Sequence, residues 1–74
     1  MIYQYNGVKD KCPLPLVKMR VILKQMKKND TCIMQIADSG SLVDIPNYLT
    51  QKGYPFTQQQ ISSSIVELHI KQVS

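Results

Sequence analysis

The sequence has few of the residues and segments on which base-stacking, disulfide-rich, zinc-binding and membrane-spanning proteins depend. It has no tryptophan, one phenylalanine and four scattered tyrosines, so no base-stacking surface is indicated. Two cysteines far apart in the sequence and a single histidine make neither a disulfide framework nor a zinc site. No apolar run approaches the roughly 18 residues that span a bilayer, and polar residues interrupt the start of the chain where a signal peptide would be apolar. We therefore expect a cytoplasmic protein with two free thiols, no metal and no cofactor.

What is present is a short and moderately basic chain. Its 74 residues suffice for one hydrophobic core, so we expect a single domain over residues 1–74, and a monomer. Nine lysines and arginines against five acidic residues give a net charge of +4. Solubility alone explains a charge of this size, and the charge also fits an acidic partner, either a nucleic acid or an acidic protein surface.

Apolar residues at helical spacing predict a first helix from Leu16 to Lys28. The Asn29-Asp30 pair then ends it. The apolar side chains of this segment fall within one arc of the helix and are expected to face the core. They are Leu16, Met19, Ile22, Leu23 and Met26.

A second helix is predicted from Asp44 to Lys52, with Gly53 as its C-terminal stop. Two N-terminal caps fit the sequence. Asp44 caps the helix if Pro46 lies in the first turn, whereas Ser41 caps it if Asp44 closes a capping box three residues further on.

The remaining segments have strand character and complete the order β-α-β-α-β-β. The predicted strands are Ile2–Asn6, Thr31–Ala37, Phe56–Ile61 and Ile65–Lys71. The second of them is apolar almost throughout, which predicts a central strand buried on both faces. A strand–helix–strand unit pairs its two strands in parallel, and the last two strands form a hairpin. We therefore expect an α+β fold, a two-layer sandwich in which a four-stranded mixed sheet carries both helices on one face.

The chemistry of the chain is concentrated in Cys12-Pro13-Leu14-Pro15, directly before the first helix. Proline lacks an N–H and holds φ near the helical value, so it suits the first turn of a helix. Pro13 and Pro15 are therefore expected to shape the site and to hold Cys12 at the helix N-terminus, near the free amides of the first turn.

The charges beside Cys12 indicate a reactive thiol. A helix N-terminus carries a partial positive charge, and Lys9 and Lys11 add to it. These charges favour the thiolate, which is the nucleophilic form, and they would equally favour a persulfide anion. A segment flanked by lysines and interrupted by two prolines is an unfavourable place for a buried structural cysteine.

The pattern as a whole resembles the TusA-like (SirA-like) sulfur-carrier family. The shared features are Cys-Pro-x-Pro before an amphipathic helix, Ala37-Asp38 at the end of a buried strand, Asp44-Ile45-Pro46, and Gly53 after the second helix. The resemblance extends from about Tyr3 to Lys71. It implies a sulfurtransferase-type carrier whose motif cysteine, Cys12, receives sulfane sulfur as a persulfide from a donor protein or thiosulfate. The sulfur would pass to an acceptor protein in tRNA thiolation, molybdenum-cofactor or thiosulfate and sulfur metabolism, with no direct contact to nucleic acid required.

Two segments depart from the family pattern. Lys9-Asp10-Lys11 stands where the family usually has Gly-Leu-x, and Asp38-Ser39-Gly40 stands where it usually has Asp-Asp/Glu-Pro. Both are loop segments, so they bear on the choice of partner rather than on the sulfur chemistry.

Asp38 and Asp44 are expected at the same end of the sheet as Cys12. Parallel pairing of the first two strands places the loops that follow them side by side. We expect both acids to be mainly structural, Asp44 as a helix cap and Asp38 as a hydrogen-bonding loop residue, while both shape the site around the cysteine.

Two features of the first helix are candidates for partner docking. Leu14, Val17 and Val21 form an apolar strip beyond Cys12 and outside the core arc. Arg20 and Lys24 belong to a basic stripe along one side of the helix. Ordinary packing explains the apolar strip equally well, and a solvated face is the simpler explanation of the basic stripe.

Two other classes of function stay open at this point. A non-catalytic regulatory or RNA-binding module of the same fold would leave Cys12 without a role. A thiol redox protein would need a resolving cysteine. We expect Cys32 to lie on the core side of its strand with Met34 and Ile36, at the opposite end of the sheet from Cys12, and therefore too far away for a disulfide.

Overall fold

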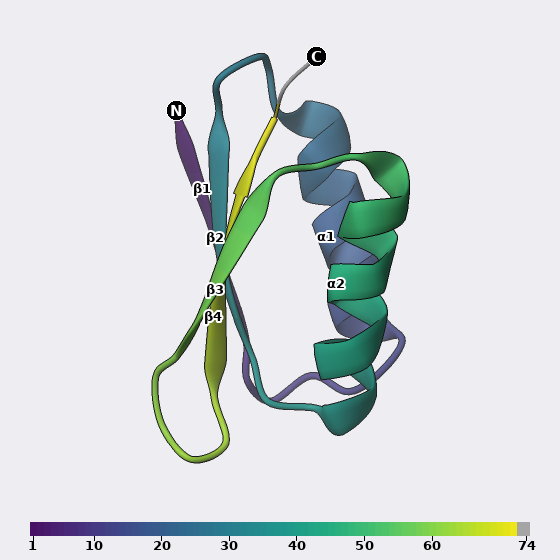
Figure 1. The fold of residues 1–74 in the computed structure, drawn as a ribbon, viewed down its shortest axis with the longest axis vertical. Helices are drawn as coiled ribbons and strands as arrows, with labels where there is room; N and C mark the ends of the chain where they lie inside the picture. The colour runs from purple at the N-terminus through teal and green to yellow at the C-terminus, as the bar shows by residue number, and fades with distance from the viewer. Residues whose placement is uncertain (73–74) are drawn as a thin grey trace.

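The computed structural model describes residues 1–72 as a four-stranded sheet with two helices packed on one of its faces (Figure 1). The elements are β1 (Ile2–Gly7), α1 (Leu14–Gln25), β2 (Thr31–Ile36), α2 (Ser39–Lys52), β3 (Phe56–Gln60) and β4 (Val66–Lys71). The strand order is β1-β2-β4-β3, with β1 and β2 parallel and the other neighbours antiparallel. The predicted two-layer sandwich is confirmed; residues 73–74 of the predicted domain lie outside the described residues. Within residues 1–72, neither helix is long and apolar enough to cross a membrane.

Helix α1 begins and ends earlier than its periodicity predicts. It starts at Leu14, because Pro13 is its N-cap residue and Pro15 lies in its first turn, where it is fully buried. It stops at Gln25, because Met26 turns to an extended conformation and the Asp30 carboxylate accepts a hydrogen bond from the Lys27 amide at 2.9 Å. Of the predicted core stripe, Leu16 and Ile22 are only partly buried at the edge of the core.

The cap of α2 lies earlier than either predicted cap. Asp38 is the N-cap, and its carboxylate accepts a hydrogen bond from the Ser41 amide at 3.1 Å. Asp44 lies in the second turn and caps nothing, and Ser41 is buried in the first turn. Both predicted starts were therefore wrong, because the Asp-x-x-Ser spacing makes a complete cap three residues before Ser41.

The early start of α2 leaves Pro46 inside the helix, where it removes one amide donor. Burial of one face of α2 outweighs this local cost, because three side chains at helical spacing on that face are completely or almost completely buried. They are Ser41, Ile45 and Leu49. Gly53 ends the helix in the left-handed conformation with φ of 79°, as predicted.

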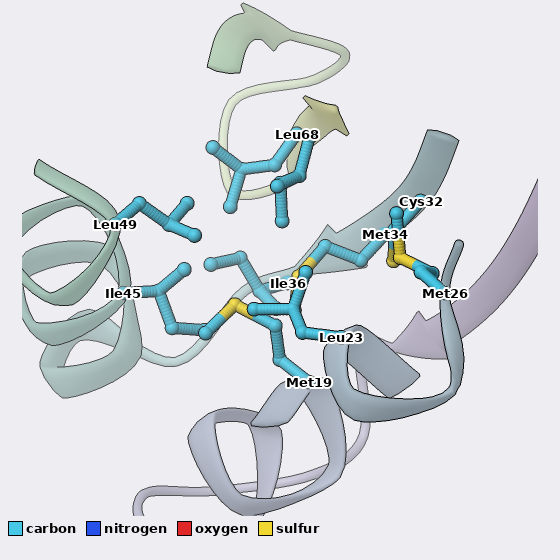
Figure 2. Close-up of a cluster of buried hydrophobic side chains, with 10 residues drawn as sticks. Met19, Leu23, Met26, Cys32, Met34, Ile36, Ile45, Leu49 and Leu68 are labelled. Carbon is cyan, nitrogen blue, oxygen red and sulfur yellow. The ribbon is translucent and has the colours of Figure 1, made fainter. Parts of the chain in front are cut away.

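The core lies between the helices and one face of the sheet. Its buried side chains are Met19, Leu23, Met26, Cys32, Met34, Ile36, Ile45, Leu49, Leu68 and Ile70 (Figure 2). Strand β2 contributes alternate residues to this core, and its other side, with Thr31, Ile33 and Gln35, is only partly buried. The prediction that β2 is buried on both faces was wrong, because both helices pack on the same side of the sheet.

Candidate functional site

The candidate site lies at the end of the sheet where both helices begin. Gly7, the last residue of β1, pairs with Ile36, the last residue of β2. Because the two strands are parallel, the loops that follow them emerge side by side and lead into α1 and α2 at the same end of the molecule (Figure 1). Cys12 lies in the first of these loops, and Asp38 lies in the second.

Asp38 joins the two loops through a single oxygen atom. Its Oδ2 accepts hydrogen bonds from the Cys12 amide at 3.2 Å, the Ser41 amide at 3.1 Å and the Ser41 hydroxyl at 3.3 Å. Hydrogen bonds from the backbone amides of Ser41 and then Cys12 hold the pKa of the Asp38 carboxyl below its usual value. Asp38 therefore stays ionised, caps α2 and fixes the backbone that carries the thiol.

Asp44 lies beside the sulfur itself. The Cys12 thiol donates a hydrogen bond to Asp44 Oδ2, with 3.5 Å between Sγ and the oxygen. Both side chains are exposed. The sequence suggested Asp44 as a cap, and the structure places it instead on the second turn of α2, directed at Cys12.

Gly40 is a site residue that the sequence analysis missed. It lies in the first turn of α2, and a Cβ at this position would lie 3.4 Å from Cys12 Cβ and 3.7 Å from Sγ. It would also lie 3.2 Å from Asp38 Oδ2. The loop and the helix approach closely here because no side chain separates them. A glycine within a capped first turn is the signal that could have indicated this contact.

The electrostatics of Cys12 are opposite to those expected from the sequence. Desolvation raises the pKa of the Cys12 thiol above its usual value, and the hydrogen bond and charge of Asp44 and the charge of Asp38 raise it further. Lys9 and Lys11 are exposed, and within residues 1–72 neither makes a hydrogen bond or ion pair with Cys12. The two neighbouring lysines are exposed, while the carboxylate that contacts the sulfur, Asp44, comes from α2.

The loop between β1 and α1 is held in place by Asp10. Its carboxylate accepts a hydrogen bond from the Tyr5 hydroxyl and forms an ion pair with Lys18 of α1 at 3.0 Å. Desolvation and the adjacent Asp10 raise the pKa of Tyr5. These contacts connect β1, the loop and α1, so the backbone on both sides of Cys12 is anchored.

The two prolines occupy different environments at the start of α1. Pro15 is fully buried, whereas Pro13 is exposed, serves as the N-cap residue and is joined to Cys12 by a cis peptide bond. The Leu14 amide donates to the Lys11 carbonyl at 2.8 Å. Within the described residues, no amide of the first turn donates a hydrogen bond to the Cys12 sulfur, which itself donates to Asp44.

The outer surface of α1 carries the predicted apolar strip. Leu14, Val17 and Val21 are 48%, 48% and 52% exposed, and Val43 of α2 is 59% exposed. Of the two predicted basic residues, both Arg20 and Lys24 are exposed. The Arg20 guanidinium also lies 5.8 Å from the centre of the Tyr48 ring of α2. Arg20 therefore contributes to helix packing through a cation–π contact.

The second cysteine lies in the core. Cys32 has no exposed surface and is a free thiol, as Cys12 is. It pairs with Tyr3 near the start of the two parallel strands, at the far end of the sheet from Gly7 and Ile36. Within residues 1–72, no group of three histidine, cysteine or acidic side chains is placed to hold a metal ion.

Comparison with known proteins finds one matching family model and a solved structure with a similar fold. The family model described as sulfurtransferase TusA matches residues 5–72. The crystal structure of a SirA-like protein from Desulfitobacterium hafniense has a similar fold, with a TM-score of 0.84 and 15% sequence identity over the whole of both chains. Among curated proteins, no sequence matches this chain.

Proposed function

The chain belongs to the TusA sulfurtransferase family, whose general role is to carry sulfur, and on this premise we propose that it carries sulfane sulfur as a persulfide on Cys12. One observation supports the choice of residue: the Cys12 thiol is exposed at the end of the sheet where both helices begin, whereas Cys32 is buried. A partner's reactive sulfur must come within bonding distance of the carrier's thiol. Of the two cysteines, Cys12 meets this requirement.

The proposed loading step exchanges one sulfur–sulfur bond for another. The Cys12 thiol loses its proton and Sγ attacks the sulfane sulfur of a donor persulfide. The S–S bond of the donor breaks, a new S–S bond forms at Sγ, and the donor thiolate leaves and takes up a proton. The sulfane sulfur keeps its oxidation state, so the step needs no external oxidant or reductant. With thiosulfate as the donor, the leaving group is sulfite. Handover to an acceptor thiol is the same exchange in the opposite direction.

We propose that donor and acceptor dock in turn on the apolar strip formed by Leu14, Val17 and Val21. The strip begins two residues after Cys12. Lys24 follows Val21 by three residues on α1, so it is a neighbour on the helix surface, and it is exposed; Val43 of α2 is exposed as well. An exposed apolar patch with a basic neighbour fits a partner surface that is apolar with acidic residues at its edge. We expect a monomeric carrier that acts in the cytoplasm, where its two thiols stay reduced.

The test is sulfur loading followed by intact-protein mass spectrometry. The wild type and Cys32→Ala, each incubated with a cysteine desulfurase and cysteine, should gain the mass of one sulfur atom, which a reductant removes. Cys12→Ser should gain none while keeping its circular dichroism spectrum. In the same assay, Val17→Ser should load more slowly from the desulfurase but at the wild-type rate from a small inorganic polysulfide.

Loading of the Cys12→Ser variant would refute the assignment of the carrier residue. If the wild type never gains sulfur and instead binds RNA in a salt-dependent manner, the non-catalytic RNA-binding interpretation would replace the carrier role.

A further inference from the structure

Asp44 differs from the other acidic residues of the chain in having no structural partner. The chain has five acidic residues, and four of them each contact at least two donors within residues 1–72. These four are Asp10, Asp30, Asp38 and Glu67. Asp44 has one contact within the same residues, with the Cys12 sulfur at 3.5 Å. Because this is the carboxylate's one contact within residues 1–72, its position points to the sulfur chemistry.

The charge of Asp44 acts on the sulfur with little local compensation. Asp38 also acts on Cys12 through its charge, but its carboxylate is bound by three hydrogen-bond donors. Asp10 pairs with Lys18, and Lys9 and Lys11 are exposed. On the facing side of α1, Arg20 stacks on Tyr48 of α2. A negative charge formed on Cys12 is therefore opposed directly by Asp44.

We propose that Asp44 makes Cys12 discharge its sulfur rather than store it, by holding the unloaded side chain as a neutral thiol and repelling the persulfide anion of the loaded one. This inference rests on the proposed carrier function. The terminal sulfur of a persulfide lies one S–S bond, about 2.05 Å, from Sγ. It therefore lies within about 5.5 Å of Asp44 Oδ2 whichever way it points, given the 3.5 Å from Sγ to that oxygen.

The repulsion acts mainly on the loaded state at neutral pH. A persulfide is a stronger acid than its parent thiol, so near neutrality the loaded side chain ionises while the unloaded one stays protonated. A nearby carboxylate disfavours the ionised form and thus shifts the exchange towards the unloaded carrier. Below the pKa of the persulfide, the loaded and unloaded side chains are both neutral, so Asp44 repels neither. Above the pKa of the thiol, both are negatively charged, so the repulsion acts on both sides of the exchange and no longer shifts it.

The experiment measures this exchange at equilibrium with glutathione persulfide. The reaction is Cys12–SH plus glutathione persulfide giving Cys12–S–SH plus glutathione, in which one S–S bond breaks, one forms, and atoms, protons and electrons balance. Asp44→Asn should raise the equilibrium constant several-fold at neutral pH, with the gain disappearing at acid pH. It should also move the pH profile of Cys12 alkylation by iodoacetamide to lower pH, which a merely structural residue would not do.

Two variants serve as controls. Glu67→Gln removes the same charge from β4, on the uncovered side of the sheet, and should leave both measurements unchanged. Asp44→Glu keeps the carboxylate and should retain most of the wild-type behaviour. If Asp44→Asn loads as the wild type does and its alkylation profile does not move, the role of Asp44 is refuted while the carrier function stands. If neither protein gains sulfur on Cys12, the carrier function itself is refuted.

Discussion

Cys12 and Cys32 carry the same thiol group at opposite ends of the sheet, in surroundings that differ in every physical respect. Cys12 is exposed, hydrogen-bonded to a carboxylate and held by a loop between two elements. Cys32 is completely buried in a strand, surrounded by the apolar side chains of the core (Figure 2). Helix α1 has 12 residues and carries the chain back between them, which at about 1.5 Å per residue spans roughly 18 Å.

The comparison shows that a raised thiol pKa has two causes with opposite implications. Burial alone raises the pKa of Cys32 to about 11, and it also closes the sulfur off from any reagent. At Cys12 the pKa rises through desolvation and through Asp44 and Asp38, while the sulfur stays within reach of a partner. The acidity of a thiol is therefore a poor guide to its role unless its accessibility and its neighbours are also known.

The largest expected difference between the two cysteines is in their rates of alkylation. At neutral pH, Cys12 should react with iodoacetamide more slowly than free cysteine, because its raised pKa leaves less thiolate, and its rate should climb as the pH passes the usual thiol value. Cys32 should react at least about a thousandfold more slowly, because it is reached only when the core opens. Peptide mapping of timed samples measures both rates. A Cys12 rate above that of free cysteine at neutral pH would restore the role expected for Lys9 and Lys11.

The stability of the fold at high pH should depend on Cys32. Its pKa is about 11 in the folded chain against an ordinary value near 9, so the folded state binds more protons than the unfolded state between these values. Titration of Cys32 should therefore lower the free energy of unfolding by about 2 kcal/mol as the pH rises from 9 to 11.

Cys32→Ala provides the matched comparison. This variant should be about 1 kcal/mol less stable than the wild type at neutral pH, because it leaves a small cavity. It should become the more stable of the two near pH 11, where the wild type has lost the contribution of its thiol. Urea unfolding of both proteins across this range is the measurement. If the free energies of unfolding of the two proteins change in parallel with pH and never cross, the prediction is contradicted, because Cys32 would then titrate in the same way in the folded and the unfolded chain.

The smallest effect is expected from Gly40→Ala, which should alter Cys12 and leave Cys32 untouched. The added methyl group would approach Cys12 Cβ to 3.4 Å and Asp38 Oδ2 to 3.2 Å, so it should displace the capping carboxylate and the loop. We expect sulfur loading to slow a few-fold. The free energy of unfolding should change by less than about 1 kcal/mol, because alanine favours the helix more than glycine does. Ser39→Ala, next to Gly40 in the same turn, is the control and should load at the wild-type rate. If the two variants load sulfur at the same rate, the proposed contact between Gly40 and Cys12 is contradicted.

Sequence patterns predicted the order of elements, the layer arrangement and the burial of Cys32, because each depends on local periodicity and on the handedness of the strand–helix–strand connection. They did not predict which acid caps α2. Asp38 and Asp44 both precede apolar helical positions. The hydrogen bonds from Ser41 to Asp38, together with the burial of Ser41, Ile45 and Leu49, decide between two starts six residues apart.

The charges at the thiol could not be predicted from neighbours in the chain. Lys9 and Lys11 are adjacent to Cys12 in sequence, yet the groups that contact it are Asp38 and Asp44, from a different element. Which side chains point at a loop residue depends on the path of the loop and on the close approach at Gly40. Neither has a periodic signal in the sequence.

The triple hydrogen bond at Asp38 Oδ2 has a mechanical consequence. Because this one oxygen holds both the Cys12 amide and the start of α2, the cysteine cannot swing out on a free loop. The movement of the Cys12 thiol is therefore limited to rotations of its own side chain. If Cys12 carries sulfur as proposed, each partner has to bring its own reactive group to this thiol.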